Sequence, residues 1–227
     1  MADPVRLNKH LAHTLGMSRR EADTCIEQGR VFVNGKMASL GNIVQPSSDT
    51  ITLDNEPITT AVKTYTYLLM NKPVGYICSR RQQGDTPTIY KLLPPEFHQL
   101  KVAGRLDKDS CGLLLLTDDG DTIFKLTHPK FGKEKVYQVG LKKPLSPEDF
   151  ELINKGIVLE DGISDLRVKP LATESEPYLY TVTMHEGRNR QIRRTFGGLL
   201  YAVTHLERVA FGDYRLEQLG DNVYLQI

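Results

Sequence analysis

The chain has 227 residues, of which 40% are hydrophobic and 25% charged, and its formal net charge is +1 at pH 7. This balance is typical of a globular protein with one core and room for a small additional domain. It excludes a chain that binds nucleic acid through its overall basicity, so a nucleic-acid site would have to be a local basic patch.

The cysteines and the N-terminal stretch bear on the location of the protein. Cys25, Cys78 and Cys111 are odd in number and form no C-x-x-C pair, which argues against a disulfide framework and against a zinc site. The stretch MADPVRLNKHLAHTLG has no apolar run like that of a signal peptide, and no segment approaches the ~20 apolar residues of a membrane-spanning helix. We therefore expect a cytoplasmic protein without membrane contact, and a monomer is the default expectation.

The N-terminal segment predicts two helices and a hairpin. Leucines recur at i, i+4 and i+8 from Leu7, which predicts one buried helical stripe. Ser18 then suits the N-cap of a second helix, and Glu21 three residues later completes a capping box. The sequence RVFVNGKMA predicts a hairpin with a type I′ turn at Asn34-Gly35, and DTITLDNEPI predicts a further short strand.

Basic residues near the start of the second helix are candidate phosphate contacts. Lys9, Arg19 and Arg20 lie there, together with the free backbone N–H groups of a helix N-terminus. By charge alone a solvated helix start is the favoured interpretation, because the segment before Thr60 holds seven acids and six basic residues. However, RLNKHLAHTLGMSRREADTCIEQGRVFVNGK resembles the S4-type RNA-binding module in the order of its helix, capped helix and hairpin. The resemblance implies that residues 1–60 form an RNA-binding domain and that the three basic side chains contact RNA.

The rest of the chain predicts a linker over residues 61–66 and a second domain over residues 67–227. YLLMNKPVGYICS predicts a strand, a turn and a second strand, and GLLLLT predicts a buried strand. Two further segments, EKVYQVGL and YLYTVTM, alternate between apolar and polar residues and predict strands. LSPEDFELINKG predicts a helix capped by Ser146 with Pro147 at its first position, GRNRQIRRTF a short basic helix, and VTHLERVAFGDYRL a further strand. The expected fold class is α+β, with a small N-terminal αα-β module followed by a domain whose mixed, largely antiparallel sheet is flanked by short helices.

One carboxylate, Asp107, stands beside the apolar stretch Leu113–Leu116. Arg105 projects to the same side of an extended segment, and a surface ion pair between the two would contribute little stability. A carboxylate in an apolar setting would instead need a cation from elsewhere in the chain to stay ionised. From the residues alone, an internal salt bridge and a phosphate-binding patch are equally open interpretations of the basic helix. The candidate donors fall at i, i+3 and i+4 of that helix, within an arginine-rich region that extends to Arg208: Arg190, Arg193 and Arg194.

Familiar catalytic and cofactor motifs are missing from the sequence. It contains no glycine-rich phosphate loop, no metal-ligand motif and no serine-nucleophile motif, so we expect no cofactor and no metal. Tyr137, on an alternating strand, is by default a core residue, but in a cleft beside Asp107 its ring could stack on a nucleobase. For Cys111, close to the Asp107 segment, a small buried filler is favoured over a reactive thiol.

Five segments resemble, in their order, the pseudouridine synthases of the RsuA/RluB/RluE/RluF group, which also carry an S4-type module in front. They are NKPVG, GRLDKDSCGLLLLTDDG, EKVYQVGL, EGRNRQIRRTF and LERVAFGDYRL. The resemblance implies a cofactor-independent catalytic domain that isomerises one uridine of an RNA to pseudouridine. Ribosomal RNA is the expected substrate, with transfer RNA as the alternative. Lys72 and Pro73, in the first segment, are expected to be mainly structural.

The resemblance also implies roles for individual residues. Asp107 corresponds to the essential aspartate that acts at the ribose C1′, and Tyr137 to the tyrosine that stacks on the target base and takes part in moving a proton. Arg193 corresponds to the basic residue that pairs with the aspartate. Arg105 corresponds to the arginine that enters the space left by the flipped base, and Leu206 to a leucine that lines the pocket. The remaining expected substrate contacts are Arg190 and Arg194.

Two other interpretations compete with this one. A non-catalytic RNA-binding or ribosome-assembly protein would use only the S4-type module, and Asp107→Asn would then leave its cellular effect unchanged. A carboxylate-based glycosidase would need a second acid across the scissile bond, for which Asp109 is the nearest candidate in the sequence.

Overall fold

The computed structural model describes residues 4–58, 64–171 and 178–227. The chain divides into two compact units, Met1–Thr64 and Tyr65–Ile227, which are described separately below. Of the expected linker 61–66, residues 61–63 lie outside the described residues. None of the helices in the described ranges combines the length and the apolar character that crossing a bilayer requires.

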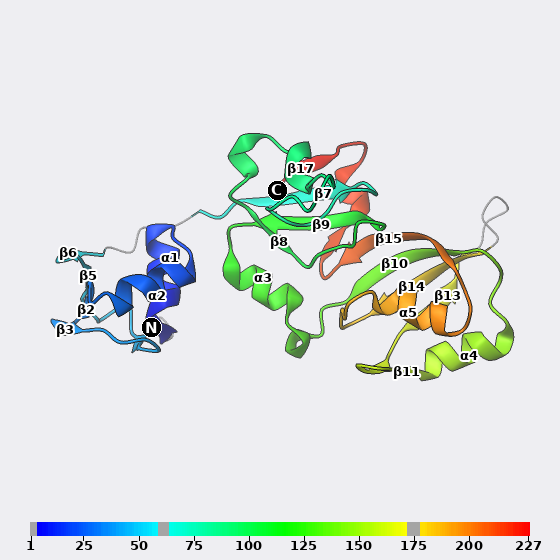
Figure 1. The fold of residues 1–227 in the computed structure, drawn as a ribbon, viewed down its shortest axis with the longest axis horizontal. Helices are drawn as coiled ribbons and strands as arrows, with labels where there is room; N and C mark the ends of the chain where they lie inside the picture. Colours follow the sequence, from blue (N-terminus) through cyan, green and yellow to red (C-terminus); the bar gives the residue numbers. More distant parts are fainter. Residues whose placement is uncertain (1–3, 59–63, 172–177) are drawn as a thin grey trace. The chain divides into compact units, whose positions relative to one another are not determined.

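The first unit contains two helices and two small sheets (Figure 1). β1 and β4 form an antiparallel pair, and the other four strands form a sheet in the order β3-β2-β5-β6. The elements are β1 (Val5–Arg6), α1 (Leu7–Leu15), α2 (Arg19–Glu27), β2 (Val31–Val33), β3 (Lys36–Met37), β4 (Ile43–Val44), β5 (Ile51–Leu53) and β6 (Glu56–Pro57).

Local sequence signals account for the turns of this unit. The predicted capping box is confirmed, because the Ser18 hydroxyl accepts from the Glu21 N–H at 3.2 Å and the Glu21 carboxylate accepts from the Ser18 N–H at 2.6 Å. The predicted hairpin is confirmed as well, with Asn34 and Gly35 at φ 51° and 75°, as a type I′ turn requires. The leucine stripe is only partly buried, since Leu15 at the end of α1 is 41% exposed.

The second unit is built on a nine-stranded sheet in the order β13-β14-β10-β15-β9-β7-β17, with β16 paired to β15 and β8 to β9. Its strand pairs are antiparallel except for a short parallel junction between β15 and β9, where Glu207 pairs with Cys111 and Arg208 with Gly112. The α+β fold class is thereby confirmed. In Figure 1 this junction joins a half of the sheet that carries β7, β8 and β17 to a half that carries β10, β13 and β14.

The strands of the second unit are β7 (Tyr67–Lys72), β8 (Lys101–Ala103), β9 (Cys111–Thr117), β10 (Lys135–Leu141), β11 (Ile157–Leu159), β12 (Gly162–Ser164), β13 (Arg167–Pro170), β14 (Leu179–Met184), β15 (Val203–Phe211), β16 (Tyr214–Arg215) and β17 (Tyr224–Gln226). Its helices are α3 (Gly120–Thr127), α4 (Pro147–Lys155) and α5 (Gln191–Gly198), with 3₁₀ turns η1 (Ile89–Leu92), η2 (Pro95–Phe97), η3 (Pro129–Phe131) and η4 (Leu216–Leu219). The helix predicted after Ser146 is confirmed, because the Ser146 hydroxyl accepts from the Asp149 N–H at 3.1 Å.

The apolar run of β9 reflects burial on both faces of the sheet. Leu114 and Leu116 pack into one core cluster, whereas Leu113 and Leu115 pack into another. Because successive side chains of a strand point to opposite faces, a strand covered on both sides has no polar positions. The continuous leucine stretch beside the Asp107 loop is therefore explained by packing.

The segment after the NKPVG turn differs from the expected second strand. Ile77 makes only a single isolated bridge, to Thr88, and the segment otherwise runs as coil. The turn itself serves another purpose, since Gly75, at φ 95°, donates its N–H to the Lys108 carbonyl at 2.7 Å. It thereby holds the loop that follows Asp107.

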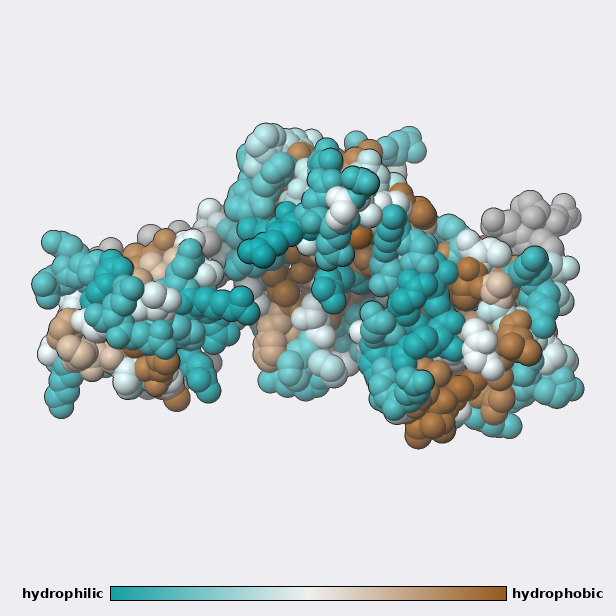
Figure 2. All heavy atoms as spheres, in the orientation of Figure 1, coloured by the Kyte–Doolittle hydropathy of each residue, from teal (hydrophilic) through white to brown (hydrophobic). Residues whose placement is uncertain are grey.

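Hydrophilic side chains cover much of the visible face of the molecule (Figure 2). An apolar patch stands out at the place of the β11–β12 hairpin and α4 in Figure 1. There Val158 is 80% exposed, Ile163 65% and Leu152 46%. The patch lies on elements that take no part in the cavity described next.

Candidate active site

A cavity of about 510 Å³ opens in the second unit, between the loop after β8, the strands β10 and β15, and the segment before α5. A volume of this size is in the usual range for a small-molecule pocket and exceeds what a single nucleobase needs. The expected site residues that line it are Arg105, Asp107, Tyr137, Arg190, Arg193 and Leu206. These residues come from four separate segments of the sequence, and folding brings them to one place.

Two buried cations hold the loop that carries Asp107. Arg208, which is 1% exposed, donates to the Leu113 carbonyl at 2.8 Å and to the Gly104 carbonyl at 3.0 Å. Lys72, which is fully buried, donates to the Ser110 carbonyl at 2.6 Å. Burial lowers the pKa of Lys72, and nearby cysteines and acids oppose this shift. The loop is thus fixed at both ends by cations that satisfy its backbone carbonyls.

Arg208 ends the arginine-rich region of the sequence, for part of which a phosphate-binding patch was one interpretation, and the structure gives this residue a different use. Its guanidinium lies under the loop and over the Phe211 ring, with 4.7 Å between the guanidinium carbon and the ring centroid. Its guanidinium donates to two backbone carbonyls of the loop, which gives it a structural use. Its position on β15 explains the burial, because the side chain points between β9 and the loop.

The guanidinium that faces Asp107 belongs to Arg190, at 3.5 Å between Nη1 and Oδ2. The side chains of Asp107 and Arg190 are 35% and 43% exposed, so the pair opens to the cavity and to solvent. Arg193, which was expected to make this pair, instead contacts Asp109, with Nε 3.3 Å from Oδ2 and Nη2 2.8 Å from the backbone carbonyl. The structure thus places Arg193 on Asp109 and not on Asp107, and the role expected for Arg193 stays a prediction.

The backbone conformation of Arg190 explains why Arg190, and not Arg193, faces Asp107. The helix α5 begins at Gln191, and Arg190 precedes it in a left-handed conformation at φ 46°. The spacing i, i+3, i+4 therefore does not place Arg190 on the face of Arg193. Its side chain is free to turn toward both acids of the loop, Asp107 and Asp109.

Asp109 is the hub of this ion-pair network. Both of its carboxylate oxygens accept from Arg190, each at 2.9 Å. This hydrogen bonding, helped by the charges of Arg193 and Arg190, lowers the pKa of the Asp109 carboxyl. A carboxylate kept ionised in this way cannot act as the general acid that a glycosidase requires. The geometry thus argues against the glycosidase interpretation.

Tyr137 and Leu206 belong to the apolar part of the cavity wall. Tyr137 is 8% and Leu206 7% exposed, and both belong to neighbouring strands of the sheet, β10 and β15. The buried positions of β10 alternate with half-buried ones, so that Lys135 points to the same side as Tyr137.

Lys135 is a cavity residue that the sequence reasoning missed. It is 7% exposed, donates to the Lys133 carbonyl at 3.2 Å, and its Nζ lies 5.1 Å from the centroid of the Phe211 ring. Burial, and then the charge of Arg208, lower its pKa from 10.5 to about 8, while Glu186 opposes the shift. Lys135 lies two residues before Tyr137 on an alternating strand, and this spacing could have predicted that both side chains point to the same side.

Ser110 is a second missed residue. Its hydroxyl is buried in the cavity wall and, among the described residues, has no hydrogen-bond partner. Buried hydroxyl groups are normally paired, so an unpaired one that lines a cavity is a candidate contact for a ligand.

Arg194 does not line the cavity. Its guanidinium makes two hydrogen bonds to the Asp161 carboxylate, at 3.0 and 2.6 Å, and Arg188 contacts the same carboxylate at 2.8 Å. Asp161 lies in the turn between β11 and β12, so Arg194 ties α5 to this hairpin. The expectation that Arg194 contacts substrate is not supported by this geometry.

The expected RNA contacts of the first unit lie on its two helices. Arg19 and Arg20 are exposed at the start of α2, and Lys9 is half-buried on α1. Arg19 donates to the Asn8 side chain at 3.3 Å. The Ser18 N–H already donates to the Glu21 carboxylate at 2.6 Å, so it is not available to a phosphate.

Comparisons with known proteins agree with the fold and the cavity. Residues 66–197 match the family model described as RNA pseudouridylate synthase, and residues 5–51 match the S4 domain. The ribosomal small subunit pseudouridine synthase A of Haemophilus influenzae is 35% identical over 216 residues, which cover 94% of this chain and 91% of that protein. The ribosomal large subunit pseudouridine synthase B of Pseudomonas aeruginosa is 37% identical over 218 residues, which cover 91% of this chain and 55% of that protein.

A solved structure extends the similarity to the backbone. The crystal structure of a pseudouridylate synthase superimposes with a TM-score of 0.68 at 32% sequence identity, covering 98% of this chain and 96% of that one. These matches define an isomerase that acts on RNA. The chain belongs to the RNA pseudouridylate synthase family, in the RsuA/RluB-type group with an N-terminal S4 RNA-binding domain.

Proposed function

We propose that the protein isomerises one uridine of ribosomal RNA to pseudouridine, with Asp107 as the group that acts at the ribose C1′. The relatives named for the small and the large ribosomal subunit support this substrate class, and transfer RNA is the alternative that the test below distinguishes. The observation that carries the assignment is that Asp107, Tyr137 and Arg190 meet in one cavity. A cytoplasmic location, with three free cysteines, is part of the proposal.

The reaction is an isomerisation, so no atom or electron is gained or lost. The N1–C1′ bond breaks, the uracil turns, C5 bonds to C1′, and the proton on C5 leaves while N1 gains one. An ionised carboxylate can bond to C1′ or balance its positive charge as the base departs. The Arg190 Nη1 lies 3.5 Å from the Asp107 Oδ2, so a positive charge faces the carboxylate.

The cavity walls suit an extruded base. The target uridine must leave its stack, because C1′ and C5 cannot be reached within paired RNA. Tyr137 offers an aromatic face, Leu206 an apolar contact, and the unpaired Ser110 hydroxyl a hydrogen bond to the uracil or the ribose. Arg105, exposed at the rim, is placed to enter the space that the base leaves.

The arginines near Asp109 position the substrate. Arg190 is shared by Asp107 and Asp109, and Arg193 is bound to Asp109. An RNA phosphate that enters the cavity competes with these carboxylates for the guanidinium groups. Lys135 adds a further positive charge to the cavity wall.

The S4 unit contributes affinity for RNA through side chains and not through the backbone N–H groups at the start of α2. The capping box of α2 places the Glu21 carboxylate at the helix start, which disfavours a phosphate on the backbone N–H groups there. Arg19 and Arg20, whose side chains extend into solvent, are therefore the proposed phosphate contacts, with Lys9 beside them.

Asp107→Asn tests the proposal. The variant keeps the shape of the side chain and should lower pseudouridine formation by roughly 10³-fold or more, with RNA affinity changed by less than about twofold. Pseudouridine is measured after carbodiimide labelling of ribosomal and transfer RNA incubated with the full-length protein. Asp213→Asn, at a side chain that is 90% exposed, is the matched control and should be fully active.

Undiminished pseudouridine formation by Asp107→Asn would overturn the catalytic assignment. RNA binding by the wild type without modification of any RNA would favour the non-catalytic alternative. Modification of transfer RNA alone would correct the substrate class and leave the role of Asp107 in place.

A further inference from the structure

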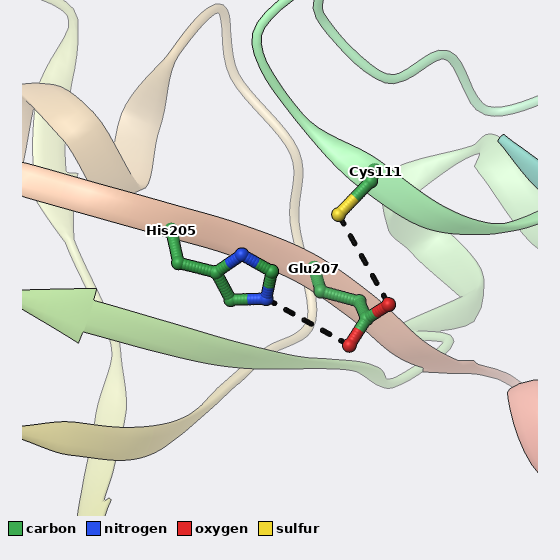
Figure 3. Close-up of side chains that lie close together, drawn as sticks. All are labelled: Cys111, His205 and Glu207. Atoms are coloured by element: carbon green, nitrogen blue, oxygen red, sulfur yellow. Dashed lines mark hydrogen bonds and ion pairs between the residues drawn. The ribbon is translucent and has the colours of Figure 1, made fainter. Parts of the chain in front are cut away.

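Three metal-ligating side chains meet on the face of the sheet that points away from the cavity (Figure 3). On β15, Leu206 and Arg208 point to the cavity side, so His205 and Glu207 point to the other side. The parallel junction pairs Cys111 of β9 directly with Glu207. The fold thus joins a thiol, an imidazole and a carboxylate, although Cys111 and Glu207 are 96 positions apart in the sequence.

The distances between the donor atoms are close to the donor-to-donor distances found around a bound metal ion. The Cys111 Sγ lies 4.0 Å from Oε1 of Glu207, and Nε2 of His205 lies 3.8 Å from Oε2. All three groups have donor atoms within 4.8 Å of one another. Ligands of tetrahedral zinc at about 2.0–2.3 Å from the metal are about 3.3–3.8 Å apart, so small side-chain rotations would close the site.

Two glycines create the space for these side chains. Gly112 has φ 99°, and a Cβ there would collide with the Arg208 backbone nitrogen at 2.7 Å and the Glu207 Cγ at 2.9 Å. Only glycine lets β9 approach β15 closely enough to bring Cys111 against Glu207. At Gly140 on β10, a Cβ would lie 3.1 Å from the His205 Cβ, so the missing side chain leaves room for the imidazole.

We propose that Cys111, His205 and Glu207 form a binding site for Zn²⁺, with water as the fourth ligand. The thiolate and imidazole select a borderline-soft transition metal over Mg²⁺ or Ca²⁺, which prefer oxygen ligands. Binding replaces the thiol proton by the metal and releases that proton to solvent. The site lies outside the catalytic cavity, and the ion takes no part in the isomerisation.

The position of the site indicates what the ion does. It links β9 to β15 at the short junction that joins the two halves of the sheet. Cys111 directly follows the Asp107 loop, and Leu206 of the cavity wall lies between the other two ligands. A bound ion therefore stabilises the part of the fold that holds the catalytic aspartate against its base-binding wall.

Metal binding to the reduced, chelator-treated full-length protein tests this proposal without any assay of activity. Equilibrium dialysis against Zn²⁺ should give about one ion per chain, and Co²⁺ in its place should give thiolate-to-cobalt charge-transfer absorption. Cys111→Ser should abolish this absorption, and Cys111→Ser, His205→Gln and Glu207→Gln should each weaken Zn²⁺ binding by at least about tenfold. Cys78→Ser is the matched control, because Cys78 is not one of the three grouped ligands and its Sγ accepts from the Leu106 N–H at 3.4 Å, and it should bind Zn²⁺ as the wild type does.

Two results would overturn the site. One is the absence of stoichiometric Zn²⁺ binding, and the other is binding that survives Cys111→Ser, which would locate the ion elsewhere. Circular dichroism of each variant separates a lost ligand from a lost fold. Metal-free Cys111→Ser should still form pseudouridine, so the outcome for the metal site is independent of the outcome for the catalytic proposal.

Discussion

The cations beneath the Asp107 loop and the cations on the S4 helices are used in opposite ways. Lys72 and Arg208 are 0% and 1% exposed and are engaged by backbone carbonyls, whereas Arg19 and Arg20 extend into solvent. A buried cation with fixed partners determines the shape of a loop, and an exposed one provides adjustable, salt-dependent attraction. In this protein, positive charge therefore has a structural use in one unit and is proposed to have a binding use in the other.

Arg208→Met should cause the largest loss of stability. It leaves the Leu113 and Gly104 carbonyls buried without their donors, and we expect the free energy of unfolding of the second unit to fall by about 3 kcal/mol. Urea denaturation measures the loss. Arg215→Met, at an exposed arginine of β16, is the control, and an equal effect of both changes would refute a special role for Arg208.

Lys135→Met should instead stabilise the protein while lowering its activity. The folded-state pKa of about 8 lies below the ordinary 10.5, so the charged form is penalised in the folded protein. The penalty is fully present below pH 8, fades between pH 8 and pH 10.5, and is absent above. Below pH 8 the variant should be more stable by about 2 kcal/mol.

Denaturation at several pH values checks the sign of this effect. The free energy of unfolding of the wild type should rise relative to that of Lys135→Met as the pH rises from 8 to 10.5, so the difference between the two proteins should shrink. Lys133→Met, at a side chain that is 37% exposed, should show no such change. A destabilised Lys135→Met below pH 8 would contradict the burial argument.

Asp109→Asn should lower the turnover rate by roughly tenfold, because Arg190 and Arg193 lose the carboxylate that positions them. RNA affinity should be unchanged or slightly higher, since both guanidinium groups become available to phosphate. A lower turnover rate without a loss of RNA affinity is the result expected of a residue that positions the arginines. Asp161→Asn releases Arg194 from the hairpin turn instead and should have the smaller effect on turnover.

Arg19→Ala and Arg20→Ala should have the smallest effects. Each should weaken RNA binding several-fold and reduce the slope of log affinity against log salt by about one. Unfolding of the S4 unit should change by less than about 0.5 kcal/mol, since both side chains are exposed. An unchanged salt slope in the double variant would place the RNA contacts of this unit elsewhere.

Much of the fold and of the site follows from sequence patterns. The capping box at Ser18, the turn at Asn34-Gly35 and the alternation around Tyr137 are local features, each encoded within a few residues. The resemblance to a family identified five ordered segments, and the cavity contains the expected residues from them with the exception of Arg194.

The errors concern the partners of long polar side chains. The helical spacing that grouped Arg190 with Arg193 and Arg194 did not apply, because Arg190 stands outside the helix at a positive φ. Arg208 resembled an RNA-binding arginine in the sequence, yet it is buried under the loop. A long side chain can reach several partners, so its choice depends on strand register and on the backbone angle at a single residue.

The sequence by itself did not predict α3, but it determined the two units, the helices α1, α2, α4 and α5, the longer strands of the second unit, the family, and the chemical groups available to the reaction. It could do so because caps, turns and periodic burial are short-range signals. Only the tertiary structure decided that Arg190 faces Asp107 and that Cys111 meets His205 and Glu207. The first contact depends on the left-handed backbone of Arg190, and the second arises where β9 and β15 pack closely at Gly112, which no local pattern of the chain expresses.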